Sequence, residues 1–210
     1  MQSVLDNLLN QLAIPPHKIS DCWHNLTQHY DELHRHYHNL THIQALLSHF
    51  ERIKPQLAQP SVVLLAIFYH DVIYQTQGKN PSSNERQSAD FFIHELGECL
   101  PNDVVNRVVD FIMATEKHEM ADKTDSDMAY FLDMDLSILG QSEAIYQAYA
   151  QAIRLEYQHV PKFLYNFSRK KALKHFLNRE RLYFTDDFVE KFEGQARENI
   201  ANEINQLKLW

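Results

Sequence analysis

The feature that most constrains the fold is an unbroken apolar run over residues 62–69, VVLLAIFY, followed directly by His70 and Asp71. A segment that is apolar on every side belongs in the interior of a folded domain. Polar side chains at the end of such a segment are costly to bury unless something pairs with them. A divalent cation satisfies an imidazole and a carboxylate together, so the run predicts a buried element that ends at a metal site.

The rest of the chain favours helices around this element. Only four glycines occur among 210 residues, and few turn clusters interrupt the sequence. A buried strand is the alternative interpretation of residues 62–69, but no neighbouring segment alternates as strands do, so a helix is favoured. We predict an all-α fold with a single domain over residues 1–210. It consists of a metal-site core at about 20–140 and a helical C-terminal extension at about 141–210.

Individual residues are expected to begin these helices. Asn39 is predicted to cap one helix, and Pro60 to start the central helix. The pattern from Ser82 to Glu85 predicts a capping box, and Thr185 is expected to cap the last helix, which has acidic residues in its first turn. Another helix is expected to start at Pro101. Further helices are predicted over residues 3–14, 20–30, 143–159, 162–178 and 186–207.

Charge and cysteine content limit the kinds of partner. The formal net charge of −8 argues against a polymeric nucleic acid, which normally needs a broad basic face. A small anionic substrate remains compatible with it, because a metal ion and a few cationic side chains set the local field. Cys22 and Cys99 are isolated and form neither a metal-type pair nor a disulfide framework. The N-terminal residues resemble neither a signal peptide nor an anchor, so we expect a cytoplasmic protein with no membrane partner.

Four residues are predicted to form one metal site: His42, His70, Asp71 and Asp135. Two neutral imidazoles and two carboxylates balance a divalent cation, and this mixed nitrogen and oxygen set leaves room for water. Asp133 competes with Asp135 for the fourth place. A helical wheel puts Asp135 within the arc of Phe131, Leu132, Ile138 and Leu139 and puts Asp133 outside it, so Asp135 is the preferred ligand.

Five motifs occur in order along nearly the whole chain: RHYHN, HD, NERQSA, TEKH and DMDLSILG. The set is similar to a bacterial group within the HD superfamily of metal-dependent phosphohydrolases, which implies an HD-type helical domain. The stretch from Tyr37 to His42 also resembles the YHNxxH motif of cyclic-nucleotide phosphodiesterases. That resemblance implies that His42 binds metal and that His38 protonates the leaving oxygen. The chain differs from phosphodiesterases in having Tyr74 three residues after Asp71, where they have histidine.

Further residues near these motifs are candidates for supporting roles. Glu85 is either only the acid of the capping box or also orients the attacking water. His118 is an additional metal ligand or a substrate contact, and Lys117 beside it can meet a phosphate. Arg35, next to the YHN motif, and Arg169, in a basic stretch near the C-terminus, are the other candidate phosphate contacts.

These features together predict a metal-dependent phosphohydrolase that cleaves a phosphoester of a small substrate, with a nucleotide the favoured class. The cofactor is a divalent ion of manganese, magnesium, iron, cobalt, nickel or zinc. Two alternatives stay open: a metal or nucleotide sensor without turnover, and an iron-dependent oxygenase on the same site. The sequence leaves the oligomeric state open.

Overall fold

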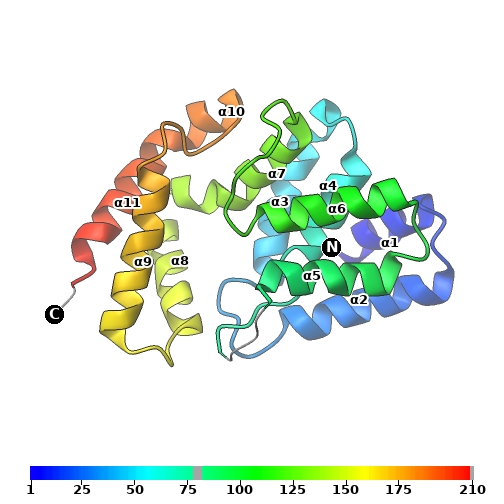
Figure 1. Ribbon diagram of the computed structural model, residues 1–210, viewed down its shortest axis with the longest axis horizontal. Helices are drawn as coiled ribbons and strands as arrows, with labels where there is room; N and C mark the ends of the chain where they lie inside the picture. The colour runs from blue at the N-terminus through cyan, green and yellow to red at the C-terminus, as the bar shows by residue number, and fades with distance from the viewer. Residues whose placement is uncertain (78–81, 209–210) are drawn as a thin grey trace. The chain divides into compact units, whose positions relative to one another are not determined.

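The computed structural model describes residues 1–77 and 82–208, and all regular structure in these ranges is helical (Figure 1). The predicted all-α class is therefore confirmed. The chain divides into two compact units, Met1–Phe131 and Leu132–Trp210, which are described separately. Among the described residues, no helix is both long and apolar enough to cross a lipid bilayer.

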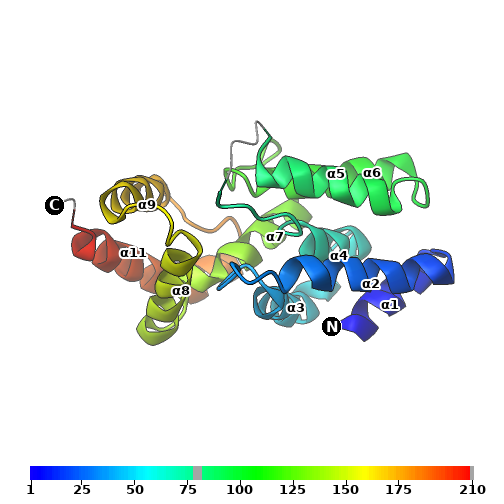
Figure 2. The same cartoon turned by 90° about the horizontal axis from the view of Figure 1, so that it is seen from below.

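In its described residues, the first unit contains six α-helices, the beginning of a seventh and a 3-10 turn at Lys54–Gln56. The α-helices are α1 (Gln2–Gln11), α2 (Pro16–Tyr30), α3 (Leu40–Ile53), α4 (Pro60–Tyr69), α5 (Asn84–Leu96), α6 (Asn102–Ala114) and α7 (Ser126–Leu136). The first two helices pack against each other, and α5 packs along α6 (Figure 2).

Helix α4 is the core of the first unit, as the apolar run predicts. It packs against α3, α5 and α6, and every residue from Val62 to Tyr69 is buried. Pro60 is its first residue, also as predicted. The carboxylate of Asp127 accepts the backbone N–H groups of Ala58 and Gln59 at 2.9 and 2.7 Å, which places a negative charge at the N-terminus of α4.

The ends of two neighbouring helices test the predicted caps. The side chain of Asn39 accepts the backbone N–H of Thr41 at 2.9 Å, so the predicted cap of α3 is confirmed. For α5 the prediction is wrong by one residue, because Ser83 rather than Ser82 is the cap and accepts the N–H of Arg86 at 3.2 Å. Glu85 is therefore not at the capping-box position, which leaves its carboxylate without that local role.

Up to residue 208, the second unit contains the end of α7, a 3-10 turn at Ser137–Gly140, and four α-helices. They are α8 (Glu143–Glu156), α9 (Lys162–Leu177), α10 (Asp186–Phe188) and α11 (Gly194–Gln206). Helix α11 packs against α9 and against the 3-10 turn. The single C-terminal helix predicted over residues 186–207 is interrupted by a π-helical turn at Val189–Glu193.

Gly140 ends the DMDLSILG motif at a close approach between segments of the second unit. A Cβ atom at this position would lie 2.5 Å from Cβ and 2.6 Å from the carbonyl oxygen of Phe192. Only glycine fits there without moving the backbone of the π-helical turn. The motif's last residue therefore has a packing role within this unit.

Candidate metal centre

His70 and Asp71 lie where α4 ends, as the sequence predicts. The His70 side chain is buried, and its Nδ1 lies 3.1 Å from the carbonyl oxygen of Ile67 in the preceding turn. A carbonyl only accepts, so Nδ1 carries the proton and donates it. The lone pair then lies on Nε2, which is the tautomer that a metal ligand requires.

His42 comes from the first turn of α3 and meets this pair. Its Nε2 lies 3.2 Å from His70 Nε2 and 3.6 Å from Asp71 Oδ2. His70 Nε2 and Asp71 Oδ2 are 3.1 Å apart. These three ligand atoms all lie within 4.8 Å of one another, and the group can hold a metal ion. Ligands about 2.1 Å from one ion are separated by about 3.0–3.4 Å in octahedral and tetrahedral sites. The observed spacing fits such an ion.

The electrostatics of the group also suit a cation. Burial by itself raises the pKa of Asp71, but the neighbouring imidazoles of His70 and His38 lower it more. The pKa therefore lies well below its usual range and the carboxylate is anionic. Three protein ligands leave further coordination positions for water, substrate or another side chain.

His38 lies beside the three ligands, in the turn that leads into α3. Its half-buried ring stacks on the ring of Tyr74, with centroids 4.0 Å apart and an angle of 26° between the planes. The centroid of the His42 ring is 6.0 Å away. The two histidines are thus close together, as expected, although the helix begins only at Leu40 and does not include His38. Its acid role stays a prediction.

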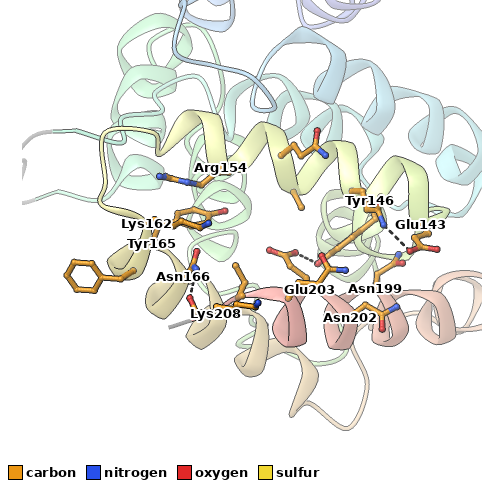
Figure 3. A pocket seen from close by; sticks show the side chains of 16 residues that line it. Glu143, Tyr146, Arg154, Lys162, Tyr165, Asn166, Asn199, Asn202, Glu203 and Lys208 are labelled. Carbon is orange, nitrogen blue, oxygen red and sulfur yellow. Dashed lines mark hydrogen bonds between the residues drawn. The ribbon is translucent and has the colours of Figure 1, made fainter. Parts of the chain in front are cut away.

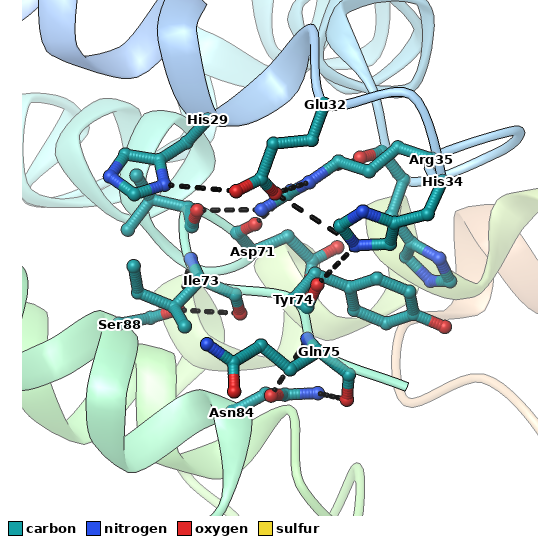
Figure 4. Close-up of polar contacts among 12 residues, drawn as sticks. His29, Glu32, His34, Arg35, Asp71, Ile73, Tyr74, Gln75, Asn84 and Ser88 are labelled. Carbon is teal, nitrogen blue, oxygen red and sulfur yellow. Dashed lines mark hydrogen bonds and ion pairs between the residues drawn. The ribbon is translucent and has the colours of Figure 1, made fainter. Parts of the chain in front are cut away.

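Two side chains of the NERQSA motif hold the loop that follows Asp71 (Figure 4). Asn84 accepts the N–H of Gln75 at 3.0 Å and donates to its carbonyl at 3.2 Å. The hydroxyl of Ser88, fully buried, accepts the N–H of Ile73 at 3.0 Å and donates to the carbonyl of the same residue at 3.3 Å. Sequence reasoning treated this motif as a family signature and missed its role, although a buried serine in a helix is a signal for such a contact.

The structure corrects the reasoning that chose Asp135 over Asp133. The wheel puts Asp133 outside the apolar arc, yet its side chain is fully buried and accepts three hydrogen bonds. The donors are the N–H of Phe184 at 2.7 Å, the N–H of Thr185 at 2.8 Å and the Thr185 hydroxyl at 2.7 Å. Thr185 is the N-cap residue of α10, as predicted, but its hydroxyl donates to Asp133 and makes no capping bond. Asp133 is thereby occupied within the second unit. Half-buried Asp135 belongs to the same unit and stays a predicted fourth ligand.

Two predicted phosphate contacts are occupied by bonds within the protein. The Arg35 side chain has no exposed surface, because its guanidinium donates to a carboxylate and to backbone carbonyls of the site loops. Arg169 forms a two-pronged ion pair with Glu203 at 2.8 and 3.1 Å in the second unit. The prediction that these side chains meet a substrate phosphate is therefore replaced by structural roles.

The remaining candidates lie in the first unit outside the three-residue group. Glu85 is half-buried in the first turn of α5. Lys117 is exposed and His118 is half-buried, and both follow α6 in the TEKH motif. His118 has a φ of 49°, which places its backbone in the left-handed region. Their predicted roles in catalysis or substrate binding stay predictions.

A separate groove of about 990 Å³ lies within the second unit, between α8, α9 and α11 (Figure 3). The buried polar side chains along it are bonded to partners within the protein. Tyr146 donates to Glu203 at 2.5 Å, and Asn166 donates to the carbonyl of Lys208 at 2.6 Å. Asn199 donates to the carbonyls of Leu139 and Gln141. The groove wall is therefore an internally satisfied network, in contrast to a set of converging ligand atoms.

No protein-family model matches the chain, and no curated protein or solved structure matches it significantly.

Proposed function

We propose that the chain is a metal-dependent phosphohydrolase of the HD type, acting on a small phosphorylated substrate with a nucleotide as the favoured class. The observation that carries the proposal is the convergence of His42 Nε2, His70 Nε2 and Asp71 Oδ2 within 4.8 Å at the end of a buried helix. The order of the five motifs supports it. The net charge of −8 favours a small substrate over long nucleic acid.

His42, His70 and Asp71 would hold the ion. A divalent cation at such a site supplies an activated water and polarises a phosphoryl oxygen. The donor set suits manganese, magnesium, iron, cobalt, nickel or zinc. Anionic Asp71 contributes the negative charge that favours binding of the cation.

His38 would protonate the leaving oxygen. An imidazole changes its charge near neutral pH, which suits a group that must give up a proton in each turnover. The stacked ring of Tyr74 restricts the orientation of the His38 ring. Lys117 and His118 would contact the phosphate, and Glu85 would orient the attacking water.

A panel of phosphorylated metabolites, tested with each of these metals, is the direct experiment. We expect metal-dependent release of phosphate or of a phosphoester product by the wild-type protein, and none from long nucleic acid. His38→Ala should keep its fold and metal but lose about 10²–10⁴-fold in turnover on substrates with a poor leaving group. The loss should shrink for an aryl phosphate, because a phenolate leaves without a proton.

Two results would contradict the proposal. No turnover on the whole panel, together with tight nucleotide binding, would support a sensor. Equal impairment of His38→Ala on alkyl and aryl esters would mean that His38 positions the substrate rather than protonating it.

An iron-dependent oxygenase is the second candidate, because two histidines and one carboxylate also form the ligand set of non-haem iron oxygenases. Iron in the purified protein, with oxygen consumption and without phosphate release, would favour this activity over hydrolysis.

A further inference from the structure

Arg35 joins two segments beside the candidate metal centre, the connection between α2 and α3 and the turn after α4 (Figure 4). Its Nε donates to Glu32 Oε2 at 2.9 Å, in the segment after α2. Its Nη1 donates to the carbonyl of His38 at 3.2 Å and to that of Asp71 at 2.6 Å. Its Nη2 donates to the carbonyl of Val72 at 2.7 Å. One guanidinium therefore bonds to the loop of the proposed general acid and to the turn that carries a metal ligand.

The surroundings of this guanidinium fix its position. The side chain has no exposed surface, and its central carbon lies 5.2 Å from the ring centroid of Tyr30 and 5.8 Å from that of Tyr74. Tyr30 in turn donates to the carbonyl of Phe68 at 2.9 Å, in the last turn of α4. A guanidinium holds several acceptors with five donors in a fixed planar fork, whereas a lysine ammonium has only three donors, all on one nitrogen atom.

The charge of Arg35 is balanced next to a site for a cation. A bare guanidinium would repel a metal ion, but Glu32 pairs with it at 2.9 Å. The same carboxylate has His29 Nδ1 at 3.6 Å and His34 Nε2 at 3.9 Å. Arg35, paired with Glu32, can therefore order the turn at Asp71 and Val72 without adding net positive charge beside the metal site.

We infer that Arg35 is a positioning residue of the metal centre, which fixes the Asp71–Val72 backbone and the His38 loop so that the ligand atoms converge before an ion binds. This inference rests on the proposed metal site but not on the reaction. Residues that orient metal ligands typically contribute a factor of about 10–100 to metal affinity.

Titration of the metal-free protein with Co²⁺, followed by its visible absorption, tests this role without any substrate. Arg35→Lys keeps the charge and loses the fork, so we expect Co²⁺ affinity to fall about 10–100-fold and the absorption bands to change. Arg169→Lys is the matched control, because it makes the same substitution at a buried, carboxylate-paired arginine of the second unit. It should leave Co²⁺ affinity and spectrum unchanged.

Glu32→Gln is the alternative test variant if Arg35→Lys does not fold. It keeps the guanidinium and removes the balancing charge at a partly exposed position, so Co²⁺ affinity should fall while the absorption bands are kept. The inference would be overturned if a folded Arg35→Lys kept the wild-type Co²⁺ affinity and spectrum. If Arg35→Lys does not fold, wild-type Co²⁺ affinity in Glu32→Gln would overturn it. If the wild-type protein binds Co²⁺ but hydrolyses no substrate, only the proposed reaction is contradicted. If it binds no metal, the proposed reaction and the role of Arg35 are both contradicted.

Discussion

Each unit of the molecule buries a polar cluster, and the two clusters differ in kind. In the second unit, the Arg169 guanidinium meets the Glu203 carboxylate at 2.8 and 3.1 Å, and Tyr146 donates to the same carboxylate. In the first unit, two imidazoles and the Asp71 carboxylate bring their ligand atoms together. The former cluster pairs a cation with an anion inside the protein, whereas the latter brings together groups that can hold a cation from solution.

The comparison separates stability from function. A charge-balanced internal pair is expected to hold its helices in place, and removing one partner leaves the other buried and uncompensated. A set of metal ligands at the end of a helix contributes through what it binds. The second unit's network, although it lines a groove, is therefore expected to contribute to stability, and the first unit's group is the one that can hold a metal ion.

The largest stability effect is expected at the Arg169–Glu203 pair. Glu203→Gln should lower the free energy of unfolding by about 3–5 kcal/mol, because the Arg169 charge stays buried without its partner. Urea unfolding measures the loss, and elemental analysis should show unchanged metal content. The double substitution Arg169→Met with Glu203→Leu should recover most of the stability. Loss of bound metal in Glu203→Gln would break the separation between the two clusters.

Removal of the metal is expected to have a smaller effect on stability, because the core of the first unit is built from apolar side chains around α4.

The reactivity of Cys22 in α2 reports on this core. Cys22 is buried, and burial raises the pKa of its thiol to about 11. With a pKa of about 11, the thiol stays protonated at pH 8, and thiolate forms only as the pH approaches 11. Because thiolate is the form that reacts, alkylation of Cys22 at pH 8 should be slow. Cys99, which is less buried, should react first.

Mass spectrometry after alkylation at pH 8, with and without a chelator, checks this expectation. Cys22 should stay protected in both samples, which would show that the core of the first unit does not depend on the ion. Rapid modification of Cys22 only after chelation would instead mean that the metal holds the core together, and the comparison would then fail for the first unit.

The sequence predicts what depends on local pattern. The unbroken apolar run identifies α4 as the buried centre, and Asn39 and Pro60 mark where α3 and α4 begin. The pair His70 and Asp71 follows directly from that run, and His42 from its motif. These three residues meet in the structure because α3 packs against α4, which brings the first turn of α3 to the end of α4.

The errors come from contacts with residues far along the chain. Asp133 looks outward on a wheel, but the segment at Phe184 and Thr185 covers it and donates to its carboxylate. Arg35 looks like a phosphate contact beside the YHN motif, but its acceptors are carbonyls of Asp71 and Val72 after α4. A helical wheel contains only local spacing, so neither contact was accessible from periodicity.

The most direct test of the central claim is elemental analysis of three proteins purified in the same way: wild type, Asp71→Ala and Asp110→Ala. Asp110 is an exposed carboxylate on α6 of the same unit, so its removal controls for the loss of one acidic side chain. We predict about one divalent ion per chain in the wild type and in Asp110→Ala, and loss of the ion in a folded Asp71→Ala. Equal metal content in all three proteins would contradict the assignment of His42, His70 and Asp71 as a metal centre.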